Sequence, residues 1–477
     1  MYLPGAEEWL RVGRKINGAD VFSTGNRKVS EEWLSNCKEE RVLTKDLMEE
    51  IADPLNLAAA LRQVVSNRGS SGIDNMSTEE LKTWFTKNCR KLSWSLRHGQ
   101  YIPTAVGEVR VPKPKGGYRI LGIPTVKDRL VQQAISQVMS NRYERVFSSY
   151  SYGFRPGISA HDGLKQASKY IEEGRNWIID MDLEKFFDKV DHDRLLWLLG
   201  TRIGDKRLLK LINRFLKAGM MKEGLVSQRI QGTPQGSPLS PLLSNIVLDE
   251  LDKELESRGH RFVRYADDLI IMVNSELSAH RVLGRIIGFI EGRLKLKVNR
   301  KKSRISRPHE LNFLGHSFGK DGKLLLSRPS EERFKEKLRE ITKRSRGISL
   351  KQLVEEVNAK LRGWLNYFKY AWMQKRLVKM EGWLNRRIRC FRLKQCKRAI
   401  GIARFLYKLG VTWNRCWTTA GSSKGWFRLS STHAAHEGMN TRWLRKIGLF
   451  SLLKHYMLHL KETAQYERRT LGGVRGR

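Results

Sequence analysis

Cysteine is scarce in this sequence of 477 residues. The five cysteines are an odd number and form no Cys-x-x-Cys pair. Disulfide frameworks and zinc fingers both depend on paired cysteines, so neither is expected, and reduced cytosolic thiols are the simpler interpretation. The five positions are Cys37, Cys89, Cys390, Cys396 and Cys416.

Long apolar runs are also missing. A membrane-spanning helix needs about 18 or more consecutive apolar residues. The longest uncharged stretch, residues 230–248, is rich in Gly, Pro, Ser and Gln. The first residues, "MYLPGAEEWLRVGRK", carry acids and a proline where a signal peptide needs an apolar core. We therefore expect no membrane partner and a cytoplasmic location.

Acidic residues are few relative to basic ones. The chain has 49 Asp and Glu against 90 Lys and Arg, which gives a formal net charge of +41 and an isoelectric point near 10.3. A surface of this kind binds polyanions, with nucleic acid as the first candidate and an anionic membrane surface as the second. The hydrophobic content of 40% is that of a globular protein, and the length predicts about three domains.

Strand and helix patterns are mixed over the first two-thirds of the chain. Residues 108–124, "EVRVPKPKGGYRILGIP", predict two short strands around a Lys-Gly-Gly turn, and residues 125–147 predict a helix. Ser77 and Glu80 have the spacing of a capping box at the start of another helix. "SPLLSNIVLDELDKEL" predicts a strongly amphipathic helix. These patterns predict an α+β fold.

Helical spacing dominates after about residue 320, where the strand signals fade. Apolar residues recur there every three or four positions, as expected for one face of a helix. They are Leu353, Val357, Leu361, Trp364, Leu365, Phe368 and Trp372. The last third of the chain is therefore predicted to be mainly α-helical.

Two adjacent carboxylates interrupt the apolar stretch "RFVRYADDLIIMV", residues 261–273. The stretch predicts two strands joined by a tight turn, with Asp267 and Asp268 beside that turn. Like charges repel, and burying them is costly unless a cation balances them. Without further context, an exposed Asp-Asp turn would be the commoner explanation.

A third acid is available in "IIDMDLEKFFDKVDH", which begins as another apolar strand. Strand alternation places Asp180 and Asp182 on the same face, and Asp182 is favoured because the strand ends there. Three carboxylates from neighbouring strands can hold Mg²⁺, a hard ion that prefers oxygen ligands. Two such ions suit in-line phosphoryl transfer.

The order of the motifs resembles a reverse transcriptase. The blocks are "RVPKPKGGYRILGIPTVKDRLVQQAI", "SYGFRPGISAHDGL", "DMDLEKFFDKVDH", "GTPQGSPLSPLLSNIVLDELD", "YADD", "LKLKVNRKKSRI" and "NFLGHSF". They are most similar to the group II intron-encoded reverse transcriptases, or maturases, particularly the compact class C type without an HNH endonuclease domain. "LRGWLNYFKY" and "LNRRIRCFRLKQCKR" resemble the helical maturase thumb, called domain X.

The resemblance implies a right-hand polymerase with fingers and an antiparallel palm sheet, followed by a helical thumb. Residues 51–320 would form the fingers and palm, and residues 321–405 the thumb. Residues 406–477 would form a basic region that binds nucleic acid. Residues 1–50 would be an extension whose role the resemblance does not give.

The resemblance also implies a catalytic set. Asp182, Asp267 and Asp268 match the catalytic acids and metal ligands, and Leu183 would offer a backbone carbonyl to a metal. Two Mg²⁺ ions are expected, with Mn²⁺ as the alternative. Lys302 matches the lysine that protonates the leaving pyrophosphate.

Six further residues match the nucleotide-binding positions of the family. Among them Phe187 would exclude a 2′-hydroxyl and so select dNTPs. Taken alone, Lys113 and Arg119 would be explained as solvated charges of a hairpin. One of Phe186 and Phe187 is expected to belong to the core. The six residues are Lys113, Arg119, Phe187, Gln235, Gly236 and Asn245.

Primer and RNA contacts are implied in the last third of the chain. Phe313, Leu314 and Gly315 match a primer-gripping turn. Residues 375–398 are strongly basic and are expected to bind RNA, although a solvated helix face is the simpler alternative. The RNA-binding candidates are Arg386, Arg387, Arg389, Arg392, Lys394, Lys397 and Arg398.

The function implied is an RNA-directed DNA polymerase that binds group II intron RNA as a ribonucleoprotein and assists splicing. It would copy the intron by target-primed reverse transcription during retrohoming. Its partners would be the intron RNA, target DNA, a primer and dNTPs, and its location the nucleoid or the ribonucleoprotein. Two alternatives stay open: a maturase that mainly stabilises folded RNA, and a domesticated relative acting in DNA repair or defence.

Overall fold

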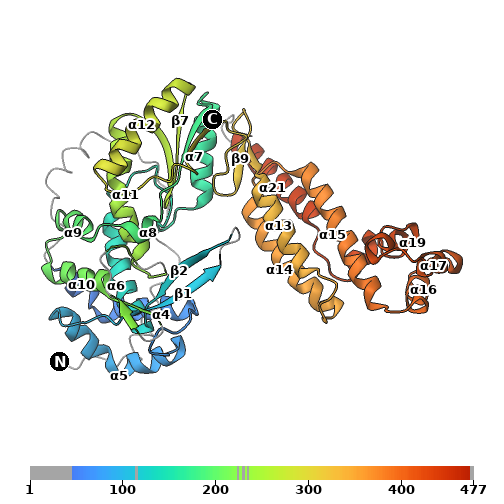
Figure 1. The fold of residues 1–477 in the computed structure, drawn as a ribbon, viewed down its shortest axis with the longest axis horizontal. Coiled ribbons are helices and arrows are strands. Elements are labelled where there is room, and N and C mark those ends of the chain that lie inside the picture. Colours follow the sequence, from blue (N-terminus) through green and yellow to red (C-terminus); the bar gives the residue numbers. More distant parts are fainter. Residues whose placement is uncertain (1–45, 113–115, 223–224, 228–230, 234–235, 473–477) are drawn as a thin grey trace. The chain divides into compact units, whose positions relative to one another are not determined.

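The computed structural model describes residues 46–472 except for 113–115, 223–224, 228–230 and 234–235. Expectations for residues 1–45, Lys113 and Gln235 fall outside the described residues. The chain divides into two units after Ser306, which is earlier than the boundary at residue 320 expected from the sequence. Figure 1 shows the elements of both units.

The first unit combines helices with two sheets. Its strands are β1 (Val106–Pro112), β2 (Tyr118–Ile123), β3 (Trp177–Met181), β4 (Met220–Lys222), β5 (Leu225–Ser227), β6 (Arg261–Tyr265), β7 (Asp268–Val273) and β8 (Arg304–Ser306). Its helices are α3 (Leu47–Ile51), α4 (Pro54–Ser66), α5 (Thr78–Arg97), α6 (Val126–Tyr143), α7 (Ala160–Glu172), α8 (Phe186–Lys189), α9 (His192–Gly200), α10 (Lys206–Lys217), α11 (Ser240–Ser257) and α12 (Glu276–Gly292).

One antiparallel sheet has the strand order β6-β7-β3-β8. Strand β7 is buried from Leu269 to Val273, so both of its faces are covered. A strand in that situation reads as a continuous apolar run, as "LIIMV" does. Helix α12 packs on β3, β7 and β8, and α7 and α11 pack on β6.

A second sheet has the order β2-β1-β4-β5. Strands β1 and β2 form the antiparallel hairpin that the sequence predicted, and β4 lies parallel to β1. The hairpin leaves Val109, Val111, Tyr118 and Ile120 exposed. Its apolar surface therefore faces away from the core of the unit.

Local signals fix the starts of two helices. At α5, the Ser77 hydroxyl accepts a hydrogen bond from the Glu80 amide at 3.2 Å, and the Glu80 carboxylate accepts one from the Ser77 amide at 2.7 Å. This confirms the capping box. Helix α6 begins behind a Thr125 cap, within the range predicted for it.

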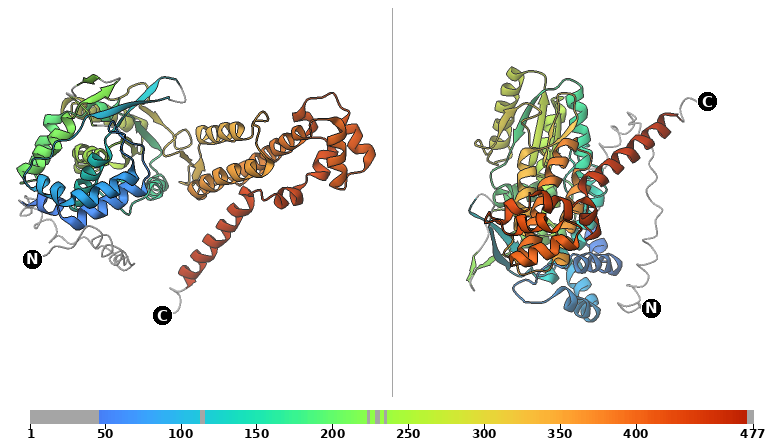
Figure 2. Two further views of the ribbon diagram at one scale, coloured as in Figure 1. Left: turned by 90° about the horizontal axis from the view of Figure 1, so that it is seen from below. Right: turned by 90° about the vertical axis from the view of Figure 1, so that its right-hand side faces the viewer.

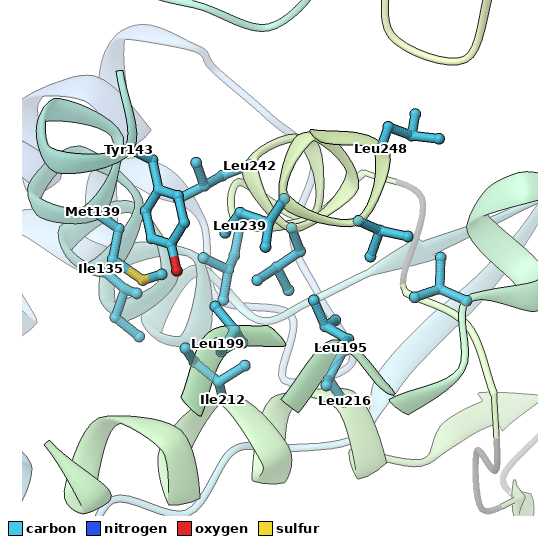
Figure 3. Close-up of a cluster of buried hydrophobic side chains, with 14 of the residues drawn as sticks. Ile135, Met139, Tyr143, Leu195, Leu199, Ile212, Leu216, Leu239, Leu242 and Leu248 are labelled. Carbon is cyan, nitrogen blue, oxygen red and sulfur yellow. The ribbon is translucent and has the colours of Figure 1, made fainter. Parts of the chain in front are cut away.

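Helix α11 is a central helix of the first core, which corrects the amphipathic prediction. Its residues from Leu242 to Asp249 are all buried, polar ones included. A helix that is covered on all sides needs neighbours around its circumference. Figure 3 shows apolar side chains of α6, α9 and α10 gathered beside it, including Ile135, Met139, Leu195, Leu199, Ile212 and Leu216.

The second unit is mainly helical, as predicted (Figure 2). After the short strands β9 (His316–Phe318) and β10 (Leu324–Leu326), its helices are α13 (Arg328–Ile341), α14 (Leu350–Phe368), α15 (Gln374–Gln395), α16 (Ala399–Lys408), α17 (Trp413–Ala420), α18 (Trp426–Leu429), α19 (His433–Gly438), α20 (Thr441–Lys446) and α21 (Leu452–Gly472). Over the described residues, none of these or of the earlier helices combines the length and apolar character of a membrane span.

The predicted apolar face of α14 forms much of the second core. Leu353, Val357 and Leu361 have no exposed surface. Trp364 is half-buried, and its ring stacks on that of Phe334 with centroids 4.3 Å apart. Trp372 departs from the predicted pattern, because α14 ends at Phe368 and the Trp372 side chain is exposed.

Replacing Leu199 with Ala should destabilise the first unit by about 2–5 kcal/mol, because the side chain is fully buried and its removal leaves a cavity. Leu277→Ala is the matched control, since Leu277 is 68% exposed. The measurement is equilibrium urea denaturation followed by circular dichroism. Equal losses in the two variants would contradict the described packing.

Candidate active site

A two-residue turn between β6 and β7 presents the paired acids. Tyr265 pairs with Asp268, which leaves Ala266 and Asp267 as the central residues of the turn. Ala266 has a φ of 57°, the left-handed value that glycine usually supplies at the first central position of such hairpins. Asp267 is half-buried, and Asp268 is exposed at the start of β7.

Asp182 reaches the same end of this sheet. Strand β3 ends at Met181, which pairs with Leu269, so Asp182 comes directly after the strand end, as expected. The amide of Asp182 donates to the Ser303 hydroxyl at 3.1 Å, and its carbonyl accepts from the Asn299 amide at 2.8 Å. The backbone of Asp182 is therefore held by the segment before β8.

The acids share one electrostatic environment. Burial raises the pKa of Asp267, and the neighbouring Asp182 raises it further. Burial and then the charges of Asp267, Asp180 and Asp182 raise the pKa of Asp268 to about 6. Because Asp268 also has an exposed surface, water screens part of this effect. A full negative charge on every member is therefore unfavourable without a cation.

Asp180 is a fourth carboxylate that the sequence argument set aside. Burial raises its pKa to about 6, the Arg304 guanidinium opposes that rise, and Asp182 adds to it. The Nε atom of Arg304 lies 3.7 Å from Oδ2 of Asp180. Asp180 thus has a protein counter-charge and adds negative charge beside Asp268.

Two cations face the acids. Nζ of Lys302 donates to both carboxylate oxygens of Asp182 at 3.1 Å. The charges of Arg119 and Lys302 both lower the pKa of Asp267. The structure therefore brings the predicted Lys302 and Arg119 to the acids, although they lie on separate segments of the chain.

The donors suit Mg²⁺ that arrives together with substrate. Among the described residues, no three His, Cys, Asp or Glu side chains form a group that would hold a metal by themselves. Mg²⁺ is usually bound by one or two carboxylates, with waters and substrate phosphates completing its shell. Half-buried carboxylates offer the hard oxygen donors that such an ion takes, and Asp182 and Asp267 stay its predicted ligands.

A cavity of about 540 Å³ brings together three residues predicted to bind a nucleotide. Arg119 from β2, Phe187 from α8 and Gly236 before α11 all line it. Arg119 also lowers the pKa of Asp267, so one cation of the cavity lining acts electrostatically on the acids.

The two adjacent phenylalanines divide as expected. Phe186 is 2% exposed and belongs to the core, and Phe187 is half-buried with its side chain at the cavity. Their rings meet edge to face with centroids 5.4 Å apart. Phe186 therefore supports the ring that borders the cavity.

Asn245 corrects a prediction. It has no exposed surface, its Nδ2 donates to the Gly153 carbonyl at 2.8 Å, and its Oδ1 accepts from Arg264 at 2.9 Å. Both ends of the amide are thus engaged inside the protein. Asn245 holds the protein together at this point and is not a direct nucleotide contact.

Sequence reasoning missed other residues of the cavity. Asn67, Gly69, Arg129, Gln133 and Phe154 line it with the predicted ones. Phe154 and Arg129 lie in sequence blocks that were recognised, but nothing in those blocks indicates which side chain faces a cavity. That information comes from packing between distant segments.

The predicted primer-gripping turn is a tight hairpin in the second unit. Phe313 and His316 exchange two backbone hydrogen bonds of 2.9 Å, and the central Leu314 and Gly315 both have positive φ. The Tyr367 hydroxyl donates to the Leu314 carbonyl at 2.9 Å. Helix α14 therefore anchors this turn, and its contact with a primer stays a prediction.

The RNA-binding candidates in the basic segment 375–398 fall into three groups. Arg389 is buried, and its Nε donates to the Met439 carbonyl at 2.9 Å. Arg387 donates to the Thr342 hydroxyl at 2.6 Å. Such arginines join helices of the second unit, which makes Arg389 unsuitable for the RNA contact expected of it.

Two more arginines of the segment pack on aromatic rings. The guanidinium of Arg386 lies 3.8 Å from the ring centroid of Phe427, and that of Arg392 lies 4.2 Å from Phe405. Lys394, Lys397 and Arg398 are exposed. Among the seven RNA-binding candidates, these three exposed residues fit the basic surface that the sequence predicted.

A second cavity, of about 950 Å³, lies among α15, α17, α18 and α19. Its lining is basic, hydroxyl-rich and aromatic, and the described residues that form it include no Asp or Glu. Arg415 is paired with Glu437 at 3.0 Å, and Lys424 and Arg428 are exposed. The cationic lining residues are Arg344, Arg386, Arg415, Lys424 and Arg428.

Two known proteins match half or more of this chain. Protein YkfC of Escherichia coli (strain K12) is 30% identical over 337 residues, which cover 62% of this chain and 88% of that protein. Group II intron-encoded protein LtrA of Lactococcus lactis subsp. cremoris is 36% identical over 250 residues, which cover 50% of this chain and 40% of that protein. The chain thus spans most of the first relative and less than half of the second.

Among solved structures, a chain of the partial Cas6-RT-Cas1–Cas2 complex is 25% identical, with a TM-score of 0.34 over 52% of this chain and 42% of that one. A likeness this weak adds nothing to the assignment.

Two protein families match successive parts of this chain. Residues 111–318 match the reverse transcriptase (RNA-dependent DNA polymerase) family, and residues 331–409 match the group II intron, maturase-specific domain. The first range contains the three acids, Arg119 and Phe187, and the second contains α14 and α15. The chain belongs to the group II intron reverse transcriptase/maturase family.

Proposed function

We propose that this protein copies group II intron RNA into DNA, binds that RNA as a ribonucleoprotein and assists its splicing. The observation that carries the polymerase part is the position of Arg119, which lines the cavity beside Phe187 and Gly236 and also acts on Asp267. In this proposal Arg119 would hold the phosphates of a triphosphate in the cavity on the side of the acids.

The chain's own residues have separable tasks in this proposal. Arg119 would bind triphosphate oxygens, since a guanidinium suits phosphate. Phe187 would occupy the space of a ribose 2′-hydroxyl. Lys302, now paired with Asp182, would be released when a metal takes that carboxylate, and would protonate the leaving pyrophosphate. Two Mg²⁺ ions, when bound, would activate the attacking hydroxyl and stabilise the leaving group.

RNA binding is assigned to the second unit. The maturase-specific match covers α14 and α15, and the basic cavity beyond them offers exposed Lys424 and Arg428 with aromatic and hydroxyl groups. Cations bind phosphates, and aromatic faces stack on unpaired bases. The proposal also includes target-primed copying at a new DNA site and membership of the compact class C type. Both rest on the sequence motifs quoted above.

Asp267→Ala should reduce DNA synthesis on a primed RNA template by more than about 100-fold. Loss of a residue that only orients a metal ligand lowers activity by about 10–100-fold, and loss of a ligand itself should lower it further. RNA binding and splicing assistance should persist, since both are assigned to the second unit. Asp193→Ala, at an exposed position of α9, is the control. Absence of DNA synthesis by the wild-type protein would overturn the polymerase proposal.

Phe187→Ala should raise rNTP incorporation relative to dNTP by about 10-fold or more, as removal of a steric contact worth about 1–3 kcal/mol allows. The ratio of kcat/KM for dATP and ATP measures this preference. Phe85→Leu changes a buried ring of α5 that is not part of the cavity lining and should leave the ratio unchanged. An unaltered ratio in Phe187→Ala would show that this ring does not select the sugar.

Removing Lys424 and Arg428 together should weaken intron RNA binding and flatten its salt dependence. Each lost phosphate contact lowers the slope of log K against log salt by about 0.7–0.9. Lys351→Ala with Lys360→Ala removes the same charge from exposed positions of α14 and should have a smaller effect. Filter binding from low to high salt compares the pairs, and identical slopes would contradict a specific role for the cavity.

A further inference from the structure

A charged side chain is buried directly behind the catalytic turn. Arg264 of β6 is 1% exposed, and its partner Asp252 of α11 has no exposed surface. Nε and Nη2 of Arg264 donate to the two carboxylate oxygens of Asp252 at 2.7 and 2.5 Å. This is the bidentate geometry in which arginine recognises a carboxylate.

The same guanidinium also reaches the turn. Nη1 of Arg264 donates to the carbonyl of Ala266 at 3.0 Å and to Oδ1 of Asn245 at 2.9 Å. The Ala266 carbonyl belongs to the peptide bond that leads into Asp267. Arg264 therefore connects the buried core to the backbone that carries the acids.

That backbone needs support. Ala266 has a φ of 57°, and an L-residue with a Cβ atom pays about 1–2 kcal/mol for the left-handed region. Residues held in such conformations persist when the surrounding structure determines them. The hydrogen bond from Arg264 to the Ala266 carbonyl is a contact that can hold the turn in this conformation.

The segment around Gly153 closes the other side of the turn. A Cβ atom on Gly153 would overlap the backbone nitrogen of Ala266, so only glycine lets the two backbones approach. Asn245 connects both supports, because it accepts from Arg264 and donates to the Gly153 carbonyl. Helix α11, strand β6 and the loop at Gly153 thus meet at the Ala266 turn.

Stability alone is a weak reason for this arrangement. A buried ion pair can often be replaced by apolar residues of similar volume without loss of stability, because the desolvation of two charges offsets their attraction. An apolar pair would lack the donor that the Ala266 carbonyl accepts from. The additional hydrogen bonds to the turn distinguish this pair from a simple core ion pair.

We propose that Arg264 is a positioning residue for catalysis: with Asp252 and Asn245 it fixes the Ala266 turn so that Asp267 and Asp268 are held ready for metal and nucleotide. This inference rests on the proposed polymerase function. Arg264 itself touches neither substrate nor metal in this scheme, and it acts through the backbone of Ala266.

The test uses the full chain with Arg264→Lys, which keeps the charge beside Asp252 but lacks the planar fork that also reaches Ala266. Hydrogen–deuterium exchange of the segment 261–273, without metal, should be faster by about tenfold or more. The Mg²⁺ concentration for half-maximal DNA synthesis should rise about 10–100-fold, as for the loss of groups that orient metal ligands. Primer–template affinity should stay unchanged.

Arg194→Lys is the matched control. Arg194 of α9 forms a partly buried ion pair with Glu250 at 2.5 Å, and its side chain is 22% exposed. Its replacement should leave both the exchange of 261–273 and the Mg²⁺ dependence at wild-type values. Arg264→Lys combined with Ala266→Gly should recover part of the lost Mg²⁺ affinity, because glycine adopts the turn conformation without a steric penalty.

Wild-type exchange and Mg²⁺ dependence in Arg264→Lys would overturn the inference, as would equal shifts in the Arg194 control. If Arg264→Lys does not fold, Asn245→Ala decides, since it leaves the Arg264–Asp252 pair in place and should shift both readouts in the same direction by less. A wild-type protein without DNA synthesis would refute the proposed function, and the exchange measurement would still test the turn.

Discussion

Carboxylates repel one another, and the first unit gathers four of them at the end of one sheet. Asp180, Asp182, Asp267 and Asp268 come from two neighbouring strands, and each of the three whose pKa is raised owes that rise first to burial. Arg304, Lys302 and Arg119 oppose this charge. The site is therefore arranged to gain from divalent cations and from a substrate that brings them.

A charge cluster of this kind needs a rigid frame. Strand β7 is covered on both faces, and α11 is buried along most of its length, so the strands cannot shift without disturbing the core. The tight turn at Ala266 transmits that rigidity to the acids. Buried polar groups on α11, which looked like parts of a polar helix face, serve the turn instead.

The large excess of basic residues divides between two uses. Several arginines in the second unit donate to backbone carbonyls or pack on aromatic rings, as Arg387, Arg389 and Arg392 do. Exposed cations such as Lys424 and Arg428 line a cavity instead. Net charge indicated a polyanionic partner correctly as a class, but it could not separate the two uses, because a guanidinium satisfies carbonyls as well as phosphates.

The sequence by itself determined the α+β fold followed by a helical region, and the family, because strand and helix patterns and the order of the motifs can be read along the chain. The catalytic roles of the acids and of Lys302 stay predictions from that order. Burial depends on contacts between distant segments, so only the tertiary structure decided that Asn245 faces inward, that Arg389 is enclosed and that Phe187 borders the cavity. The pair "DD" could be read from the chain. The guanidinium of Arg264 behind it could not, because its partners Asp252 and Asn245 lie on another element and meet it only when α11 packs against β6.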